Sequence, residues 1–302
     1  MRSKQMGNLI HGCCLAFSIL LGMVLSPVTS AVALHIQEDD EVIIPGGAYY
    51  VGPVFGHHDY MAHANTQRSA FAIMKTEVTY HFYQSVVSWA NEHGYHLNDG
   101  CNGAEYEDCQ PGEKDGGLHP VTNLTWWDAI LFANALSEMR NLSPVYLSSD
   151  NQPLRLVAAD TAPPILHKNP SNTGYRLPDI AEWQIAAKGG VRGMKDGTYG
   201  ASFAGSTRAD EVAIFPQNSG KRFATAPVAS LLPNSAGLYD MSGNVSEWLD
   251  ESIEIEGGNR MYYFCGGSYL ERTATLAACD VHTPGFLTPD IGFRLIRKLH
   301  ES

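Results

Sequence analysis

The stretch Gly237-Leu-Tyr-Asp-Met-Ser-Gly-Asn-Val-Ser-Glu-Trp248 is the most informative part of the chain. It combines two carboxylates, Asp240 and Glu247, with a turn-forming Gly243 and a large aromatic residue at its end. Such a segment can curl around a hard cation, because carboxylate and backbone carbonyl oxygens are the ligands that calcium prefers. The same residues also suit a plain turn between two strands that ends in an aromatic core residue. The stretch alone leaves both interpretations open.

The first 33 residues are predicted to be a secretory signal peptide. Arg2 and Lys4 make a short basic start, residues 13–25 form an uncharged apolar run, and Ala31-Val-Ala33 fits a cleavage site. The apolar run is short for a membrane-spanning helix. We therefore expect a secreted or periplasmic protein that begins at Leu34, without stable membrane insertion after cleavage. An uncleaved anchor is the alternative.

The charge balance of the chain is strongly acidic. It has 20 Lys and Arg against 32 Asp and Glu, a formal net charge of −12, and loss of Arg2 and Lys4 with the signal peptide would make it more acidic. This charge argues against nucleic acid and against anionic membranes as partners. The 302 residues contain no internal repeat, low-complexity tract or linker. They are predicted to form a single domain over residues 41–300.

Four cysteines remain after the predicted signal peptide: Cys101, Cys109, Cys265 and Cys279. An even number of cysteines in an exported protein indicates disulfides. The polar loop between Cys101 and Cys109 predicts a bridge between these two residues. Cys265 and Cys279 form either a second bridge or two buried thiols, and the sequence leaves this choice open.

The regular structure is predicted to be concentrated in the first two thirds of the chain. Residues 42–52 indicate two short strands around a Pro-Gly-Gly turn, and residues 71–79 alternate like a strand. Three helices are expected, each after a residue that caps helix N-termini. They are residues 80–93 after Thr79, 126–139 after Thr125, and 180–187 after Asp179. The last hundred residues are expected to hold mainly loops and short strands.

Seven segments together resemble one known family, the formylglycine-generating enzymes or sulfatase-modifying factors. In order, they are Val42-Ile-Ile-Pro-Gly-Gly47, Lys75-Thr-Glu-Val-Thr79, Pro120-Val-Thr-Asn-Leu-Thr-Trp-Trp-Asp-Ala129, Tyr175-Arg-Leu-Pro-Asp-Ile-Ala-Glu-Trp-Gln-Ile-Ala-Ala-Lys-Gly-Gly190, the stretch 237–248, Gly266-Gly-Ser-Tyr269 and Gly292-Phe-Arg-Leu295. The resemblance runs from about residue 41 to residue 297. It implies an α+β fold related to C-type lectins, with little regular secondary structure.

The resemblance also locates the family's reactive positions. Members that generate formylglycine use two cysteines to bind copper(I), and the matching positions here are Glu271 and Leu276. A carboxylate and a leucine cannot make a copper(I) dithiolate. Copper is therefore not expected, and neither is sulfatase activation.

The resemblance also implies a calcium site, and this chain retains suitable ligands at more of its positions than at those of the copper site. Its ligands would be the side chains of Asp240 and Glu247 and the backbone carbonyls of Gly243 and Val245, and the ion would be structural. The second calcium site of the family has no clear counterpart among residues 203–227.

Glu271 is the candidate catalytic residue, because a carboxylate in the family's cleft can serve as a general acid or base. A surface position or an ion pair beside Arg272 is the alternative. Further candidates are His282, His119 and the histidines of one loop, His57, His58 and His63. Arg176 and Glu182 are expected to be buried ion-pair or turn-fixing residues, and Trp126, Trp183 and Trp248 to lie in the core.

Two functions compete on this sequence. The first is an exported oxidative or maturation tailoring enzyme for a secreted peptide or siderophore-type substrate. It would resemble the family branch that lacks the copper cysteines and finishes the pyoverdine chromophore. The second is a non-catalytic module that binds a periplasmic protein partner, with the acidic residues 94–117 as a contact surface. The side chains around Glu271 should discriminate between them.

Overall fold

The computed structural model describes residues 40–52, 64–157, 166–216, 223–271 and 275–299, which belong to one compact unit, Ile36–Ser302. The predicted signal peptide and His57, His58 and His63 lie outside these residues. Among the described residues, no helix combines the length and apolar character needed to cross a bilayer.

The three predicted helices are confirmed to within one residue. They are α1 (Tyr80–Glu92), α2 (Trp126–Met139) and α3 (Ile180–Ala187). Thr79 Oγ1 accepts a hydrogen bond from the amide of Phe82. Thr125 with Asp128, and Asp179 with Glu182, form reciprocal capping boxes. These caps satisfy amides that have no partner in the first helical turn, so the helices begin where the sequence places the caps.

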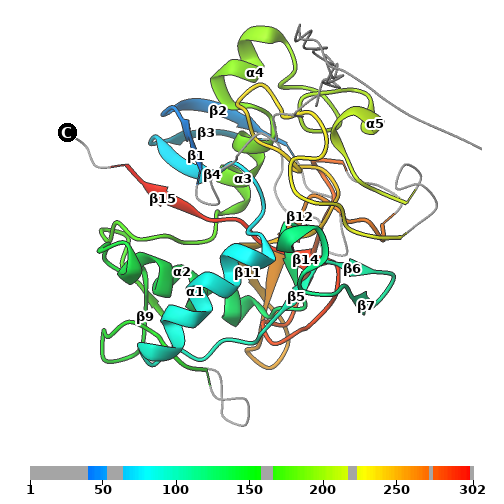
Figure 1. Cartoon of the computed structure of the whole chain (residues 1–302). Coiled ribbons are helices and arrows are strands. Elements are labelled where there is room, and N and C mark those ends of the chain that lie inside the picture. Colours follow the sequence, from blue (N-terminus) through cyan, green and yellow to red (C-terminus); the bar gives the residue numbers. More distant parts are fainter. Residues whose placement is uncertain (1–39, 53–63, 158–165, 217–222, 272–274, 300–302) are drawn as a thin grey trace, which may run out of the picture. The chain divides into compact units, whose positions relative to one another are not determined.

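Helices α1 and α2 lie side by side and pack into one apolar core (Figure 1). Tyr83 of α1 stacks on Phe132 of α2 with 5.2 Å between ring centroids, and Phe132 contacts Phe293 edge-on at 5.3 Å. Trp126 and Trp248 are fully buried in this core, as predicted. Residues from the beginning, middle and end of the chain thus close the same core.

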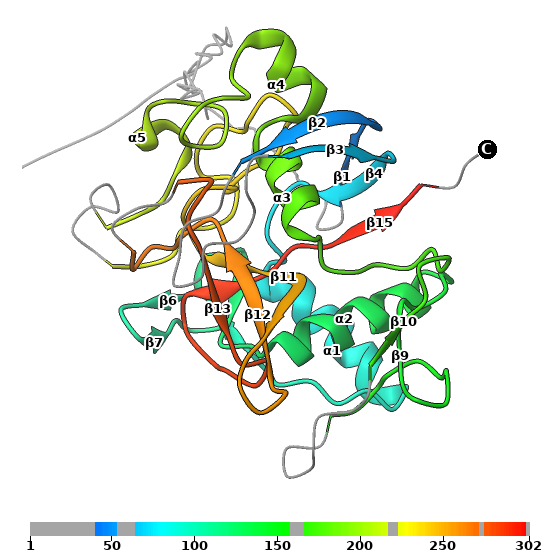
Figure 2. The same cartoon turned by 180° about the vertical axis from the view of Figure 1, so that it is seen from behind.

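The second core lies between α3 and two small sheets. One sheet has the order β1 (Glu41–Ile44), β4 (Phe71–Met74), β15 (Ile296–Lys298), and the other pairs β2 (Gly47–Val51) with β3 (Ala64–Arg68). Figure 2 shows α3 beside these strands. The third predicted core tryptophan, Trp183, is fully buried here.

The predicted strand 71–79 is wrong in length, because β4 ends at Met74. Beyond it, the amide of Lys75 donates to Asp40 and the amide of Val78 donates to Phe293. The backbone there bonds to separate segments of the chain in place of a continuing ladder. This departure carries Glu77 into the interior, where it is 1% exposed.

A four-stranded sheet of order β13-β12-β11-β14 lies in the C-terminal part. Its strands are β11 (Ser246–Glu254), β12 (Arg260–Cys265), β13 (Cys279–His282) and β14 (Ile291–Gly292). The nine residues of β11 exceed the short strands expected from the sequence. The pairing of β11 with β12 is interrupted between Trp248 and Ser252, where the amide of Asp250 donates to Pro178.

Small elements complete the unit: β5 (Cys101–Asn102), β6 (Ala104–Glu105), β7 (Asp108–Cys109), the 3-10 turn η1 (Lys114–Gly117), β8 (Val121–Thr122), β9 (Tyr146–Leu147), β10 (His167–Lys168), α4 (Gly190–Asp196) and α5 (Ala209–Val212). The predicted Cys101–Cys109 disulfide is confirmed. Cys265 and Cys279 form a second disulfide, in register across β12 and β13. This bridge resolves the alternative that the sequence left open.

Candidate functional sites

The stretch 237–248 folds around a buried ion pair between Glu247 and Arg294. Arg294 Nη2 lies 2.7 Å from Glu247 Oε1, and the two side chains are 0% and 1% exposed. Arg294 Nε also donates to both carboxylate oxygens, and the indole N–H of Trp183 donates to Oε2 at 2.9 Å. The carboxylate is thereby both neutralised and well supplied with donors, which is the condition for burying a charge.

Two more carboxylates, those of Glu77 and Asp240, are buried near this ion pair. Glu77 accepts from the side chain of Asn244 at 2.8 Å and from the amide of Val245 at 3.1 Å, while Asp240 Oδ2 accepts from the amide of Ala229 at 2.7 Å. Burial raises the pKa of Asp240 to about 6, and burial together with Asp240 and Glu247 raises the pKa of Glu77 well above its usual range. The positive charge of the Arg294 guanidinium therefore acts on three buried acids, Glu247, Glu77 and Asp240.

Sequence reasoning found Asp240 and Glu247 but assigned no role to Glu77 or Arg294. Both residues stand in quoted segments, Lys75-Thr-Glu-Val-Thr79 and Gly292-Phe-Arg-Leu295. The available signal was a charged residue between β-branched or apolar neighbours, Thr76 and Val78 for Glu77 and Phe293 and Leu295 for Arg294, because such a residue is buried only with a partner.

The calcium ligands implied by the resemblance fit this arrangement only in part. Asp240 and Glu247 lie in one buried cluster, but Glu247 is already neutralised by Arg294. Among the described residues, no three His, Cys, Asp or Glu side chains are grouped to hold a metal ion. An ion here would share Glu247 with Arg294 and depend on the carbonyls of Gly243 and Val245. Calcium binding therefore stays a prediction.

Glu271 lies just after the Gly-Gly-Ser turn and is half-buried. Burial raises its pKa to about 7, and Asp290 and Asp280 add to the shift by charge repulsion. Ser268 donates to Asp290 at 2.9 Å and so holds that carboxylate in place. Arg272, the suggested ion-pair partner, lies outside the described residues.

The second reactive position of the family is closed. Leu276 is 5% exposed and packs in the same core as Cys265 and Cys279. The disulfide consumes both thiols that stand near these positions in the sequence. Where formylglycine generators carry a pair of thiolates, this chain presents one acid and one core side chain.

His119 and His282, two of the candidate histidines, have structural contacts. His119 is 2% exposed; its Nδ1 lies 2.8 Å from Thr225 Oγ1 and its Nε2 2.9 Å from Asp115 Oδ2. Burial lowers the pKa of His119, and the hydrogen bond to Asp115 opposes this shift. His282 stacks on Phe286 with 3.3 Å between ring centroids. Within the described residues, no hydrogen bond or ion pair joins either histidine to Glu271.

A cavity of about 1300 Å³ lies between the N-terminal end of α2 and strands β11 and β12. Its apolar lining includes Leu97, Trp127, Leu131, Tyr262 and Leu287. Asp128 lines it as well, but the carboxylate accepts from the amide and side chain of Asn98 and from Thr125. The wall thus combines apolar and aromatic side chains with polar ones, among them the charged Lys168, Asp250 and Arg260.

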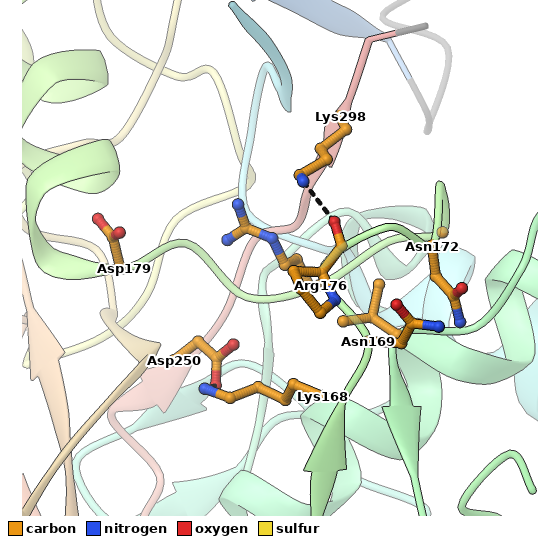
Figure 3. Close-up of a pocket in the computed structure, with 10 residues that line it drawn as sticks. Lys168, Asn169, Asn172, Arg176, Asp179, Asp250 and Lys298 are labelled. Atoms are coloured by element: carbon orange, nitrogen blue, oxygen red, sulfur yellow. Dashed lines mark hydrogen bonds and ion pairs between the residues drawn. The ribbon is translucent and has the colours of Figure 1, made fainter. Parts of the chain in front are cut away.

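A smaller cavity of about 410 Å³ shares two lining residues with the larger one, Lys168 and Asp250. Figure 3 shows the Lys168 ammonium against the Asp250 carboxylate, at 3.1 Å. Lys298 donates to the carbonyl of Pro170 on the other side of the cavity. Burial raises the pKa of Asp250 to about 6, and Lys168 and Arg176 oppose this shift.

Arg176 also lines the smaller cavity, but its guanidinium is committed. It binds Glu182 through two hydrogen bonds, at 2.6 and 2.8 Å. This is the structural ion pair expected from the sequence. The pair ties Arg176, three residues before the α3 cap Asp179, to the first turn of that helix.

Comparisons with known proteins agree with this fold. The profile of the family described as "Sulfatase-modifying factor enzyme 1-like domain" matches residues 28–299. The chain therefore belongs to the formylglycine-generating-enzyme-like family of sulfatase-modifying factors, and its fold is the single-domain α+β fold of that family.

Two curated relatives differ in how much they share with the chain. "Chaperone protein LppX" of Paenibacillus barcinonensis is 30% identical over 283 residues, which are 86% of this chain and 89% of that protein. The formylglycine-generating enzyme of Streptomyces coelicolor is 28% identical over 148 residues, which are 40% of this chain and 46% of that enzyme.

Solved structures extend the comparison. The crystal structure of CarF is 56% identical, with a TM-score of 0.80, and covers 86% of this chain and 98% of CarF. PvdO from Pseudomonas aeruginosa is 18% identical, with a TM-score of 0.58 over 87% of this chain and 96% of PvdO, which shows the shared fold alone.

Proposed function

We propose that this chain is an exported, non-catalytic binding protein that holds other exported polypeptides, in the manner of a chaperone. The observation that carries the proposal is the state of the family's two reactive positions. Leu276 is packed in the core, and the charges acting on Glu271 come from two further acids. Among the described side chains, Glu271 has no His or Arg contact to complete an acid–base pair.

Two further observations support this proposal. One relative is named as a chaperone, Chaperone protein LppX, and the match covers most of both chains. The signal-like first 33 residues and the two disulfides favour export, because disulfides persist in oxidising compartments.

The test is suppression of aggregation by the protein purified from the exported fraction. Heated citrate synthase serves as the probe and light scattering as the measurement, with serum albumin at equal mass as the control. We expect the wild type and Glu271→Gln to suppress scattering equally, because binding does not use an ionisable Glu271. Absence of suppression by the wild type would remove the proposal.

A tailoring enzyme is the second candidate, and the raised pKa of Glu271, about 7, favours it. A carboxyl that titrates near neutral pH can act as a general acid or base on a secreted peptide or siderophore-type substrate. Metabolite profiles of a deletion strain, complemented with the wild type or with Glu271→Gln, test this candidate. Catalysis predicts that Glu271→Gln slows turnover by roughly two to four orders of magnitude. Full complementation leaves the binding protein ahead.

A further inference from the structure

The carboxylate of Asp250 is turned out of its sheet by a break in the strand ladder. The pairing of β11 with β12 shifts between Trp248 and Ser252, and the amide of Asp250 donates to Pro178 instead of to β12. Bulges of this kind re-aim a side chain and are enriched next to binding sites. The result is a carboxylate, 6% exposed, that lines both cavities.

The counter-ion of Asp250 is loosely held. Lys168 is 47% exposed and belongs to β10, a strand of two residues paired only with β9. An ion pair with a half-exposed lysine contributes little to stability, because water competes for the ammonium and the long side chain must be ordered. Asp250 also interacts with the buried hydroxyl of Tyr146 and with Arg176, so Lys168 is the exposed partner that can be exchanged.

The larger cavity continues from Asp250 along an aromatic wall. Tyr262 stacks on the buried Trp126 with 3.7 Å between ring centroids, and Trp127 meets Trp126 edge-on at 5.1 Å. Trp126 itself is fixed by a hydrogen bond from its indole to the carbonyl of Leu249. Tyr262 and Trp127 thus line the cavity on a rigid support, which lowers the entropy cost of binding against them.

We propose that the larger cavity binds an extended polypeptide segment in which an Arg or Lys stands among apolar residues. The cation of the segment takes the place of Lys168 on Asp250, and its apolar side chains lie against Trp127 and Tyr262. The inference rests on the proposed holding function and names its binding site and the chemistry of its client.

Size and charge favour this occupant. The volume of about 1300 Å³ exceeds the roughly 300–1,000 Å³ of small-molecule pockets. The chain carries a net charge of −12, so basic segments are attracted to it at long range. Lys168 already shows that an ammonium group reaches this carboxylate.

Two peptides test the inference by isothermal titration against the full protein. One is acetyl-Leu-Phe-Arg-Phe-Leu-amide, and its twin carries neutral citrulline in place of arginine. We expect the arginine peptide to bind at least about tenfold more tightly, since its cation meets a buried acid. Asp250→Asn should remove this difference, and Lys168→Met should tighten the arginine peptide severalfold by removing its competitor. Lys195→Met, on the exposed face of α4, is the matched control and should change neither affinity.

Equal affinity of the two peptides for the wild type overturns the inference, and so does a preference that survives in Asp250→Asn. If Asp250→Asn does not fold, the effect of Lys168→Met decides, and unchanged binding in that variant counts against the site. Citrate synthase protection without peptide discrimination removes this inference and leaves the proposed function. Discrimination without protection removes the proposed function and leaves a peptide site.

Discussion

Strand β11 carries two buried carboxylates, three residues apart, that the fold treats in opposite ways. Glu247 has a fully buried guanidinium and an indole N–H as partners, and every partner comes from the core. Asp250 interacts with the Tyr146 hydroxyl and with Arg176, but its ion-pair partner is a half-exposed lysine from a two-residue strand. The first arrangement fixes the protein's own segments to one another, whereas the second leaves a partner that can be exchanged.

The difference arises from where the two residues stand in the sheet. Glu247 lies in regular pairing with β12 and β14, opposite Cys265 and Gly292, and its side chain points into the packed interior. Asp250 lies in the bulge, where the strand turns toward the cavities. A carboxylate held only by core groups is expected to be structural, and one at a cavity with an exposed partner is expected to bind ligands.

Removal of Arg294 should break the core arrangement with the largest effect. Arg294→Met leaves Glu247, Glu77 and Asp240 without a cation, and loss of one partner of a buried pair costs about 3–5 kcal/mol. Chemical denaturation measures the loss. Lys168→Met is the matched control, because it removes the ion-pair partner of the second acid on β11, and it should cost less than about 1 kcal/mol. Similar losses of unfolding free energy in the two variants would show that the ion pairs of Glu247 and Asp250 do not differ in their contribution to stability.

Calcium binding would be a second test of the cluster around Glu247. If the ion binds at Asp240, Gly243, Val245 and Glu247, it stabilises the protein by about 3 kcal/mol at a hundredfold excess over its Kd, and EGTA lowers the Tm. Asp240→Ala should remove this EGTA-dependent shift. The shift is compared, and not the Tm itself, because Asp240 has a φ of 56°, which strains an alanine. Identical melting with and without EGTA would leave Arg294 as the sole counter-charge.

The pH dependence of stability should show the smallest effect, at the Asp250 end. The pKa of Asp250 is raised to about 6, above the roughly 3.9 of an unfolded Asp. The folded state therefore binds the proton more tightly, and this contribution to stability is complete below about pH 4 and lost as the pH rises to about 6. Asp250→Asn does not titrate, so its stability should not fall in this way. The free energy of unfolding of the variant should therefore rise relative to that of the wild type as the pH increases from about 4 to about 6. Urea denaturation at three pH values measures the gain, and parallel curves would contradict it.

Local sequence decided the helices and one disulfide. Thr79, Thr125 and Asp179 each satisfy amides within their own first turn, so the starting points follow from neighbours in sequence. Cys101 and Cys109 are close along the chain and find each other with a short loop. The seven ordered segments were sufficient for the family and its fold, which the family profile matches over residues 28–299.

Tertiary structure alone decided which charges meet. Glu247 and Arg294 are 47 residues apart, and Glu77 and Asn244 are 167 apart, so no local pattern reveals either contact. The same holds for the Cys265–Cys279 bridge, which depends on the register of β12 with β13, and for the bulge that aims Asp250 at Lys168. The sequence by itself determined the family, the caps and the loss of the copper thiolates. The packing of distant segments determined which acids are neutralised in the core and which one faces a cavity, because burial and pairing depend on neighbours that only the folded chain supplies.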